Sequence, residues 1–253
     1  MTANNPDSKI DAQLQNWNNF CQYHLGDWHG VWTRYSPTGE AIESFKCVRQ
    51  FHVSEDGNRI NHKNFFTYFD GREPKTDCYT YNKPDGRTMF LDNSFSWGKQ
   101  IIQVNSTFGF EIGFRLKNSG ATAAVLYDHN DNLQRITISL ERLGEFAKEE
   151  LHPSKNEPKD TWQGIIISMM PNLTTSSPKA TTWQQIENIS DNYQILHFSN
   201  SVSVGCPLKI HSGEEVLFAM DWRANSSFLQ RGIRHFDRDG FKYFTLETFS
   251  VNP

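Results

Sequence analysis

The sequence predicts an all-β fold in which two related antiparallel barrels follow one another along the chain. Short segments of alternating apolar and polar residues recur through most of the 253 residues, separated by turns rich in Gly, Asp, Asn and Pro. Aromatic residues make up 13 % of the chain, and this favours strands over helices. Landmarks at the start of the first half return in the second. Two barrels are favoured over open sheets because closure removes exposed strand edges.

The N-terminal segment is the exception to this strand pattern. Apolar side chains recur over residues 8–25 at helical spacing, namely Ile10, Leu14, Trp17 and Phe20. A glycine, Gly26, then ends the helix. We expect this apolar stripe to close one end of the first barrel.

The first half reads as a series of short strands with regular turns. The expected strands are 28–35, 42–53, 59–69, 76–82, 89–104, 108–116, 122–127 and 133–140. The segment 89–104 is long enough to bend or break, and Gly98 is the expected point. This pattern is typical of a meander that closes into a barrel.

A polar segment with two prolines separates this series from the next. Residues 141–151 fit a short helix, and the domain boundaries follow as 1–142 for the helix and first barrel, 143–161 for a linker and 162–253 for the second barrel. The strands expected in the second barrel are 162–169, 183–187, 193–200, 202–210, 216–223, 228–236 and 241–251.

The two halves share an opening motif. Trp28-His-Gly30 begins the first half and Trp162-Gln-Gly164 begins the second, and a proline follows each Trp at the same distance. An aromatic-Asp turn lies near the end of both halves, at Tyr127-Asp128 and Phe236-Asp237. Two matches in the same order indicate an internal duplication.

The entry to the first strand resembles a known motif. Gly26-Asp-Trp28, placed after an amphipathic helix, is similar to the Gly-x-Trp entry of lipocalins and the wider calycin group. The resemblance implies structural roles for Trp28 and Trp162 beneath their barrels, with an Arg lying over each Trp. It implies Arg234 as the Arg that covers Trp162, while the Arg over Trp28 has to come from elsewhere in the first half.

The whole chain also resembles a two-barrel, calycin-like family of uncharacterised proteins from photosynthetic organisms. The motifs that carry this resemblance are Trp17-x-x-Phe20, the run Gly26–Pro37 and Arg234-x-Phe236-Asp237. Distant calycin relatives include bilin-handling chromophore lyases, fatty-acid carriers and an oxylipin cyclase. The resemblance to the two-barrel family therefore implies a fold, and the class of ligand is suggested only by analogy with the wider calycin group.

Composition argues against several classes of partner. The 25 basic and 29 acidic residues give a net charge of −4 without a long basic run, which disfavours nucleic acid. No apolar run approaches the roughly 20 residues of a membrane helix, and the polar start lacks a secretion signal, so a cytoplasmic protein is expected. The nine histidines show no ligand spacing and no cofactor motif occurs, so neither a metal nor a cofactor is expected.

Charged residues on apolar strand faces are the candidate ligand-binding groups. Arg49 shares its face of a strand only with apolar residues, so it requires a partner, either a protein carboxylate or an acidic ligand. Arg34 and Arg231 raise the same question. His197 and His235 lie at matching strand parity and could line one cavity. The candidate set is therefore Arg34, Arg49, Arg231, His197 and His235.

Three functions are compatible with these features. The first is binding of an apolar or amphipathic small molecule of bilin, apocarotenoid or fatty-acid type in a barrel. The second is an enzyme of chromophore-lyase or cyclase type that uses the same cavity. The third is a structural or interaction protein whose barrels are filled by their own aromatic side chains. Binding is favoured over catalysis because no nucleophile signature or phosphate loop is present in the sequence.

Overall fold

A computed structural model gives the three-dimensional structure. It describes residues 6–82, 88–103, 105–147, 162–189, 193–198, 201–211 and 213–251, and the side chains from residue 12 onward. Within these residues no helix is long and apolar enough to cross a membrane.

The described residues are all-β apart from one α-helix and one short 3₁₀ turn, as the sequence predicts. After helix α1 (Pro6–Tyr23), the first half holds strands β1 (Gly26–Tyr35), β2 (Ala41–Val53), β3 (Arg59–Tyr68), β4 (Lys75–Asn82), β5 (Thr88–Leu91), β6 (Ser94–Gly98), β7 (Phe108–Leu116), β8 (Ser119–Tyr127) and β9 (Leu133–Leu143). The second half holds β10 (Gln163–Met169), β11 (Lys179–Thr182), the 3₁₀ helix η1 (Ile186–Ile189), β12 (Gln194–Phe198), β13 (Val202–Cys206), β14 (Val216–Asn225), β15 (Phe228–Asp237) and β16 (Gly240–Ser250).

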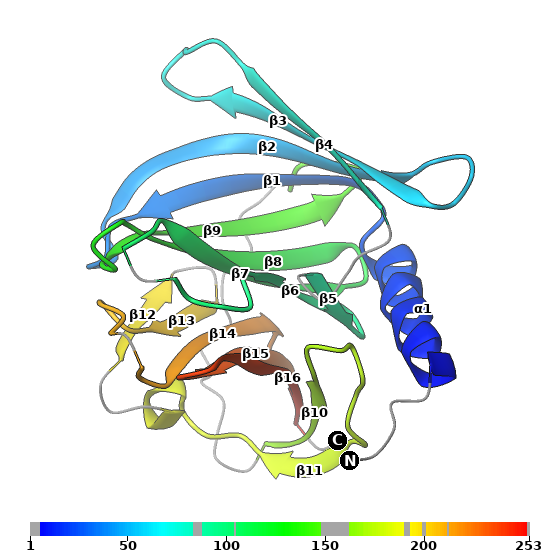
Figure 1. Cartoon of the computed structure of the whole chain (residues 1–253). Helices are drawn as coiled ribbons and strands as arrows, with labels where there is room; N and C mark the ends of the chain where they lie inside the picture. The colour runs from blue at the N-terminus through cyan, green and yellow to red at the C-terminus, as the bar shows by residue number, and fades with distance from the viewer. Residues whose placement is uncertain are drawn as a thin grey trace.

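These strands form two antiparallel sheets, one from each half. The first has the order β4-β3-β2-β1-β9-β8-β7-β6-β5 and curls into a half-barrel, and the second has the order β11-β10-β16-β15-β14-β13-β12 and lies beneath it (Figure 1). Closed barrels were expected, but β4 and β5 remain as edges of the first sheet, and β11 and β12 as edges of the second. The correction has a physical reason: each sheet buries its apolar face against the other sheet, so closure is not needed to form a core.

The opening motif occupies the same place in both sheets. In each half the first strand pairs with the last, β1 with β9 and β10 with β16. Gly30 lies opposite Glu141 and Gly164 lies opposite Phe249, and a Cβ on either glycine would lie 2.4 Å from a carbonyl oxygen of the partner strand. The Trp-x-Gly motif thus marks a close approach of backbones, and the repeated register supports the duplication that the sequence indicates.

The main hydrophobic core lies between the two sheets. Alternate residues of β7 and β8 point into it and meet apolar residues of β14 and β15, including ring contacts of Phe110 with Phe236 and of Phe114 with Trp222. Since side chains alternate across a strand, the other residues of β7 and β8 must face the inside of the half-barrel. The inside of the half-barrel is therefore lined by the polar face of these strands.

Helix α1 lies at one end of the half-barrel, beside the edge strand β5 (Figure 1). Trp17 and Phe20 pack with Ile60 of β3 and with Phe90 and Phe95 of β5 and β6. The closing role is as expected, but Leu14 is 49 % exposed and does not belong to the buried stripe. The side chain of Ile10 lies outside the described residues.

Polar side chains of the helix also cap the edge strand β5. The amide of Asn16 accepts a hydrogen bond from Phe90 N at 2.6 Å and donates to Thr88 O at 3.2 Å, and Asn19 donates to Phe90 O at 2.9 Å. These bonds satisfy backbone groups that an edge strand would otherwise expose. The sheet edge is covered by side chains rather than by a further strand.

Three local predictions are wrong. The expected strand 89–104 is a hairpin whose turn lies at Asp92, with a positive φ of 50°, and Gly98 only ends its second strand. The expected strand 183–187 does not form. Strand β11 ends just before it, at Thr182, and the 3₁₀ helix η1 begins inside it, at Ile186. Residues 141–143, expected to begin a helix, instead form the end of β9, where Leu143 still pairs with Trp28. Residues 148–151 of the expected helix lie outside the described residues.

Candidate functional site: the interior of the half-barrel

The interior of the first half-barrel contains a cluster of buried charges. Arg49 on β2 is 5 % exposed and its Nη1 lies 3.2 Å from Oε1 of Glu111 on β7. Its Nε lies 3.5 Å from Oε1 of Glu141 on β9. The partners of Arg49 are therefore protein carboxylates, one of the two alternatives that the sequence leaves open.

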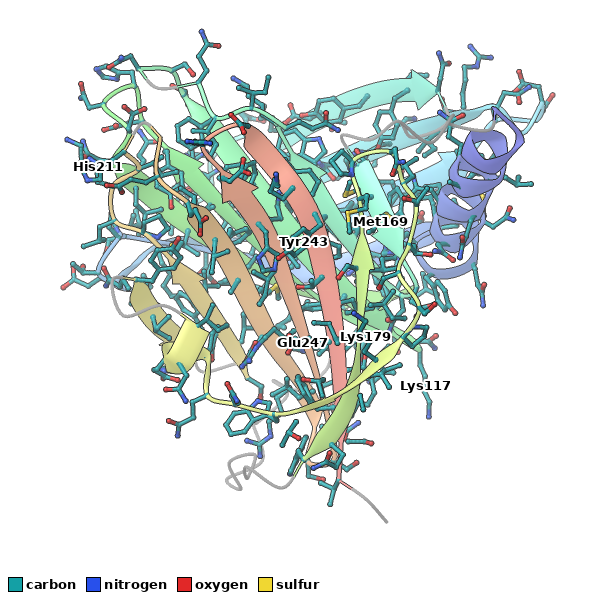
Figure 2. All side chains as sticks on the ribbon, turned by 60° about the horizontal axis from the view of Figure 1, so that its bottom comes forward. Lys117, Met169, Lys179, His211, Tyr243 and Glu247 are labelled. Atoms are coloured by element: carbon teal, nitrogen blue, oxygen red, sulfur yellow. The ribbon has the colours of Figure 1, made fainter. Side chains whose placement is uncertain are left out.

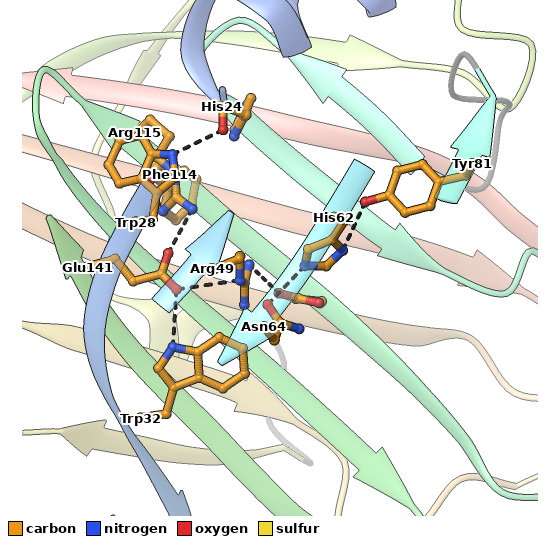
Figure 3. A network of polar contacts seen from close by, with 11 residues as sticks. His24, Trp28, Trp32, Arg49, His62, Asn64, Tyr81, Phe114, Arg115 and Glu141 are labelled. Carbon is orange, nitrogen blue, oxygen red and sulfur yellow. Dashed lines mark hydrogen bonds and ion pairs between the residues drawn. The ribbon is translucent and has the colours of Figure 1, made fainter. Parts of the chain in front are cut away.

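Glu141 is the centre of this cluster (Figure 3). Its Oε2 accepts a hydrogen bond from Nη2 of Arg115 at 2.7 Å, and its Oε1 accepts one from Nε1 of Trp32 at 3.1 Å. The guanidinium of Arg49 also lies 4.5 Å from the centre of the Trp32 ring. Burial alone would raise the pKa of Glu141, but the charges of Arg49 and Arg115 and its hydrogen bonds hold that pKa below its usual range.

Two glycines make room for the cluster. A Cβ on Gly120 would lie 2.1 Å from Nη1 of Arg115, and a Cβ on Gly30 would lie 2.7 Å from Cγ of Glu141. Gly120, Glu141 and Gly30 are neighbours across β8, β9 and β1. Gly30 of the opening motif therefore leaves room for the Glu141 side chain as well as for the backbone of the partner strand.

Arg115 supplies the Arg that the calycin resemblance implies over Trp28. Its guanidinium lies 4.0 Å from the centre of the Trp28 ring. The resemblance also implied Arg234 over Trp162, and this expectation is corrected. Arg234 lies between the two sheets, with its guanidinium 4.4 Å from the Phe241 ring and hydrogen bonded to Ser96 Oγ of β6 at 2.6 Å. The reason is parity, because Arg234 projects from the face of β15 that packs against the first sheet.

A second polar group adjoins the cluster on β3 and β4. His62 hydrogen bonds to Asn64 Oδ1 at 2.9 Å and to the hydroxyl of Tyr81 at 3.0 Å (Figure 3). Burial, reinforced by the charge of Arg49, lowers the pKa of His62 to about 4. His62 is therefore neutral at neutral pH.

A cavity of about 210 Å³ lies beside the charge cluster, inside the half-barrel. It is lined by Trp32, Arg34, Phe45, Arg49, Phe66, Glu111, Thr122, Ala124, Arg135, Thr137 and Ser139. The aromatic residues come from β1, β2 and β3, whereas β8 and β9 supply mainly small and hydroxyl-bearing residues. A larger hollow of about 330 Å³ lies over β2, β3 and β4, and its described lining holds no buried polar atom without a partner.

The cations of the cavity differ in how they are neutralised. Arg34 is paired with Glu43 at 2.6 Å, and Arg72 contacts the same carboxylate. Arg135 has no carboxylate partner within the described residues, and burial together with the charge of Arg34 lowers its pKa. One guanidinium of the cavity is thus left with uncompensated charge.

Two hydroxyl groups at the inner end of the cavity also lack partners. Thr122 and Ser139 are 3 % and 2 % exposed, and neither hydroxyl oxygen has a hydrogen-bond partner among the described residues. The two residues lie directly opposite each other on β8 and β9. A buried hydroxyl without a partner costs about 1–3 kcal/mol. The cavity therefore offers two polar groups that protein atoms do not satisfy.

The other predicted site residues lie in the second sheet, away from this cavity. Arg231 is bound by both oxygens of Asp221, at 2.7 and 2.8 Å, and His197 is exposed and contacts Glu187 and Ser203. Both lie on the face turned away from the first sheet, the side shown in Figure 2.

His235 lies on that same face beside Tyr243, with their ring centres 4.3 Å apart, and Tyr243 is labelled in Figure 2. Burial lowers the pKa of His235 to about 4. The candidate set is therefore divided, with Arg34 and Arg49 in one sheet and the other three residues in the second sheet.

Sequence reasoning missed most of the interior residues, including Glu111, Arg115, Glu141, Thr122 and Ser139. In β9 the polar residues Thr137, Ser139 and Glu141 alternate with Ile136, Ile138 and Leu140, a pattern that normally indicates a solvated outer face. Here the apolar face packs against the second sheet, so the polar face turns inward. The sequence signal for these residues was the alternation in β9. It indicates a polar interior only when a second sheet is known to bury the apolar side.

The buried histidines predict loss of stability in acid. His24, His62 and His235 have pKa values below 6.5, mainly through burial, so they are neutral in the folded protein and take up protons on unfolding. Stability should therefore fall as the pH drops below about 6.5 and continue to fall towards the folded-state pKa values, by roughly 1–3 kcal/mol for each of His62 and His235, with a further loss from His24. Urea unfolding at about pH 7 and about pH 4.5 measures this change.

A substitution tests the origin of the acid effect. His235→Gln should reduce the difference in unfolding free energy between the two pH values, while His211→Gln, at an exposed position, should leave it unchanged. An equal pH dependence in wild type and the His235 variant would show that His235 does not contribute.

The fold and the interior together define a barrel-like β protein with a polar, charged cavity. Residues 13–146, more than half of the chain, match the family model DUF3598_N, described as "Domain of unknown function (DUF3598), N-terminal". The chain belongs to this DUF3598 family. A search of curated proteins found no match.

A solved structure shares the whole fold. A DUF3598 family protein of unknown function from Nostoc punctiforme superposes with a TM-score of 0.78 at 19 % sequence identity, covering 94 % of this chain and 99 % of that chain. The match to a protein from Bacteroides fragilis covers 95 % of this chain and 99 % of that chain, at 8 % identity and with a TM-score of only 0.28. The comparisons establish the family and its fold.

Proposed function

We propose that the first half-barrel binds a small amphipathic molecule with an acidic group, in the manner of the calycins that the sequence resembles. The observation that carries this proposal is Arg135, a guanidinium on the wall of the cavity with no carboxylate partner among the described residues. Arg34 is paired with Glu43 but lies close enough to lower the pKa of Arg135, so an anion beside Arg135 is favoured at this end of the cavity. Trp32, Phe45 and Phe66 supply apolar surface for the rest of the ligand.

The volume limits the size of the ligand. Pockets for drug-sized ligands have volumes of about 300–1,000 Å³. The cavity of about 210 Å³ therefore fits a short amphipathic acid better than an apocarotenoid or a long fatty acid, and a bilin requires an enlarged cavity. The volume therefore favours a compact acid, smaller than the bilin, apocarotenoid and fatty-acid types that the sequence suggests.

The second half is better suited to a structural role. The side of its sheet turned away from the first half is covered by η1, whose Ile186 packs on Ala219 and Ile233. Trp162, Trp183, Leu229 and Phe249 form a further cluster. These side chains occupy the position that a ligand would need. The second half therefore fits the third function suggested by the sequence, a structural role with an interior filled by its own side chains.

Titration calorimetry with two matched probes tests the proposal. Phenylpropionate should bind the wild-type protein, and the neutral phenylpropionamide should bind at least tenfold more weakly, since a charge-assisted hydrogen bond contributes roughly 1.5–3 kcal/mol. Arg135→Gln should weaken phenylpropionate binding by about the same factor with little change in melting temperature, because Arg135 forms no ion pair with any residue that the structure describes.

Arg142→Gln is the matched control, because this Arg lies on the opposite face of the same strand. It should leave binding unchanged. Equal affinity for the acid and the amide, or no binding of either, would contradict the proposal.

A further inference from the structure

We propose that the hydroxyls of Thr122 and Ser139 form the specificity subsite of the cavity and select ligands with an oxygen-bearing group at the end opposite the acid. This inference rests on the proposed function and specifies the chemical group at the end of the ligand opposite the acid. It starts from two buried hydroxyl oxygens that have no hydrogen-bond partner among the residues the structure describes.

The geometry brings both hydroxyls to one ligand atom. Thr122 and Ser139 are directly paired across β8 and β9, and residues paired in this way have Cβ atoms about 4.5–5.5 Å apart on the same face. Both belong to the lining of the cavity. A hydroxyl or carbonyl oxygen between them can accept from one hydroxyl, and a ligand O–H can donate to the other.

The local packing leaves the two hydroxyls without a bonding partner among the described neighbouring side chains. The residue opposite Thr122 on β7 is Gly113, and a Cβ there would lie 2.9 Å from Thr122 Oγ1 and 2.2 Å from Phe95 Cε1. The side chain next to Ser139 on β1 is Trp32, whose ring is held by Glu141 and Arg49. The hydroxyls are thus surrounded by fixed groups that cannot turn to satisfy them.

The same strand sets the distance between the two ends of the ligand. Ser139, Thr137 and Arg135 follow one another at two-residue spacing on the inner face of β9. Four residues of strand span roughly 13 Å, and the Arg135 side chain shortens the distance that the ligand must bridge. A planar aromatic acid with a para oxygen substituent matches this spacing, with its ring against Trp32 and Phe45.

The test compares para-hydroxyphenylpropionate with phenylpropionate by titration calorimetry. These probes share the acid and the ring and differ only in the oxygen at the far end. In the wild-type protein the hydroxylated acid should bind roughly tenfold more tightly, because it can form one or two additional hydrogen bonds. Thr122→Val and Ser139→Ala should each bring the ratio of the two affinities closer to one. Both variants should leave the affinity for phenylpropionate within a factor of about two of the wild-type value.

Stability measurements separate this role from a folding role. Thr122→Val is nearly isosteric and removes an unsatisfied hydroxyl, so its melting temperature should equal or exceed that of the wild type. Thr33→Val is the control, because Thr33 lies on the opposite face of β1 and its hydroxyl is bonded to Ser44 at 2.9 Å. It should leave the preference between the two acids unchanged.

The outcomes distinguish the two proposals. If phenylpropionate binds but the hydroxylated acid binds equally well, the hydroxyls hold only water and the subsite is overturned while the proposed function stands. If neither acid binds, both are overturned. A preference for the hydroxylated acid that survives Thr122→Val and Ser139→Ala together would place the selecting group elsewhere and also overturn the inference.

Discussion

Replacing Glu141 by glutamine is expected to destabilise the protein by about 3–5 kcal/mol, because it leaves two buried guanidinium groups without their shared carboxylate. Glu141 is 2 % exposed and contacts both Arg49 and Arg115. The new amide can retain the bond from Trp32, but it cannot neutralise either Arg. Urea unfolding of the purified variant measures the change.

The control for this change is Glu43→Gln at the rim, which removes the partner of Arg34 and Arg72. A more exposed ion pair contributes about 0–1 kcal/mol, so this variant should remain close to wild type. If Glu141→Gln does not fold, the double variant with Arg115→Gln should recover part of the loss, because the two side chains are directly coupled. A loss below about 1 kcal/mol would show that the cluster does not hold the half-barrel together.

Deletion of residues 1–24 is expected to cause the second large loss of stability. The helix buries Trp17 and Phe20, and each large apolar side chain contributes about 1.5–3 kcal/mol on burial. The deletion also removes the bonds of Asn16 and Asn19 to β5 and exposes the apolar Phe90 and Phe95. A strong fall in melting temperature and a tendency to aggregate should follow.

Single substitutions in the helix give the same information on a full-length chain. Phe20→Ala should cost about 3–5 kcal/mol, whereas Leu14→Ala, on the exposed side, should cost less than about 0.5 kcal/mol. Equal effects of the two substitutions would contradict the proposed closure of the half-barrel by the helix.

Local sequence patterns were sufficient to place most strands but not to say what lies on either side of them. The alternation in β2 predicts that Arg49 shares a face with apolar residues, and the structure places it inside the half-barrel. Its partner Glu111 lies 62 residues away on β7, and no local pattern indicates that pairing. Pairing across a sheet depends on strand order, which local patterns along the sequence do not reveal.

The inverted polarity of β7, β8 and β9 is the deeper reason for the missed residues. A single barrel places its apolar face inside, so the sequence patterns of these strands predict interior residues on the apolar face. In this fold the apolar residues Phe110, Ile112 and Ile138 pack between two sheets, so the interior receives the polar residues. The site could be recognised only once the second sheet was known to cover the first.

Native mass spectrometry of the full chain purified from its own host tests the ligand-binding function most directly. The half-barrel cavity predicts that the wild-type protein retains a small acidic molecule, and that the Arg135→Gln protein, prepared in the same way, has lost most of it. Equal retention by both proteins would contradict the assignment of the site. A wild-type protein that carries no small molecule and binds neither phenylpropionate nor its hydroxylated analogue would contradict the function itself.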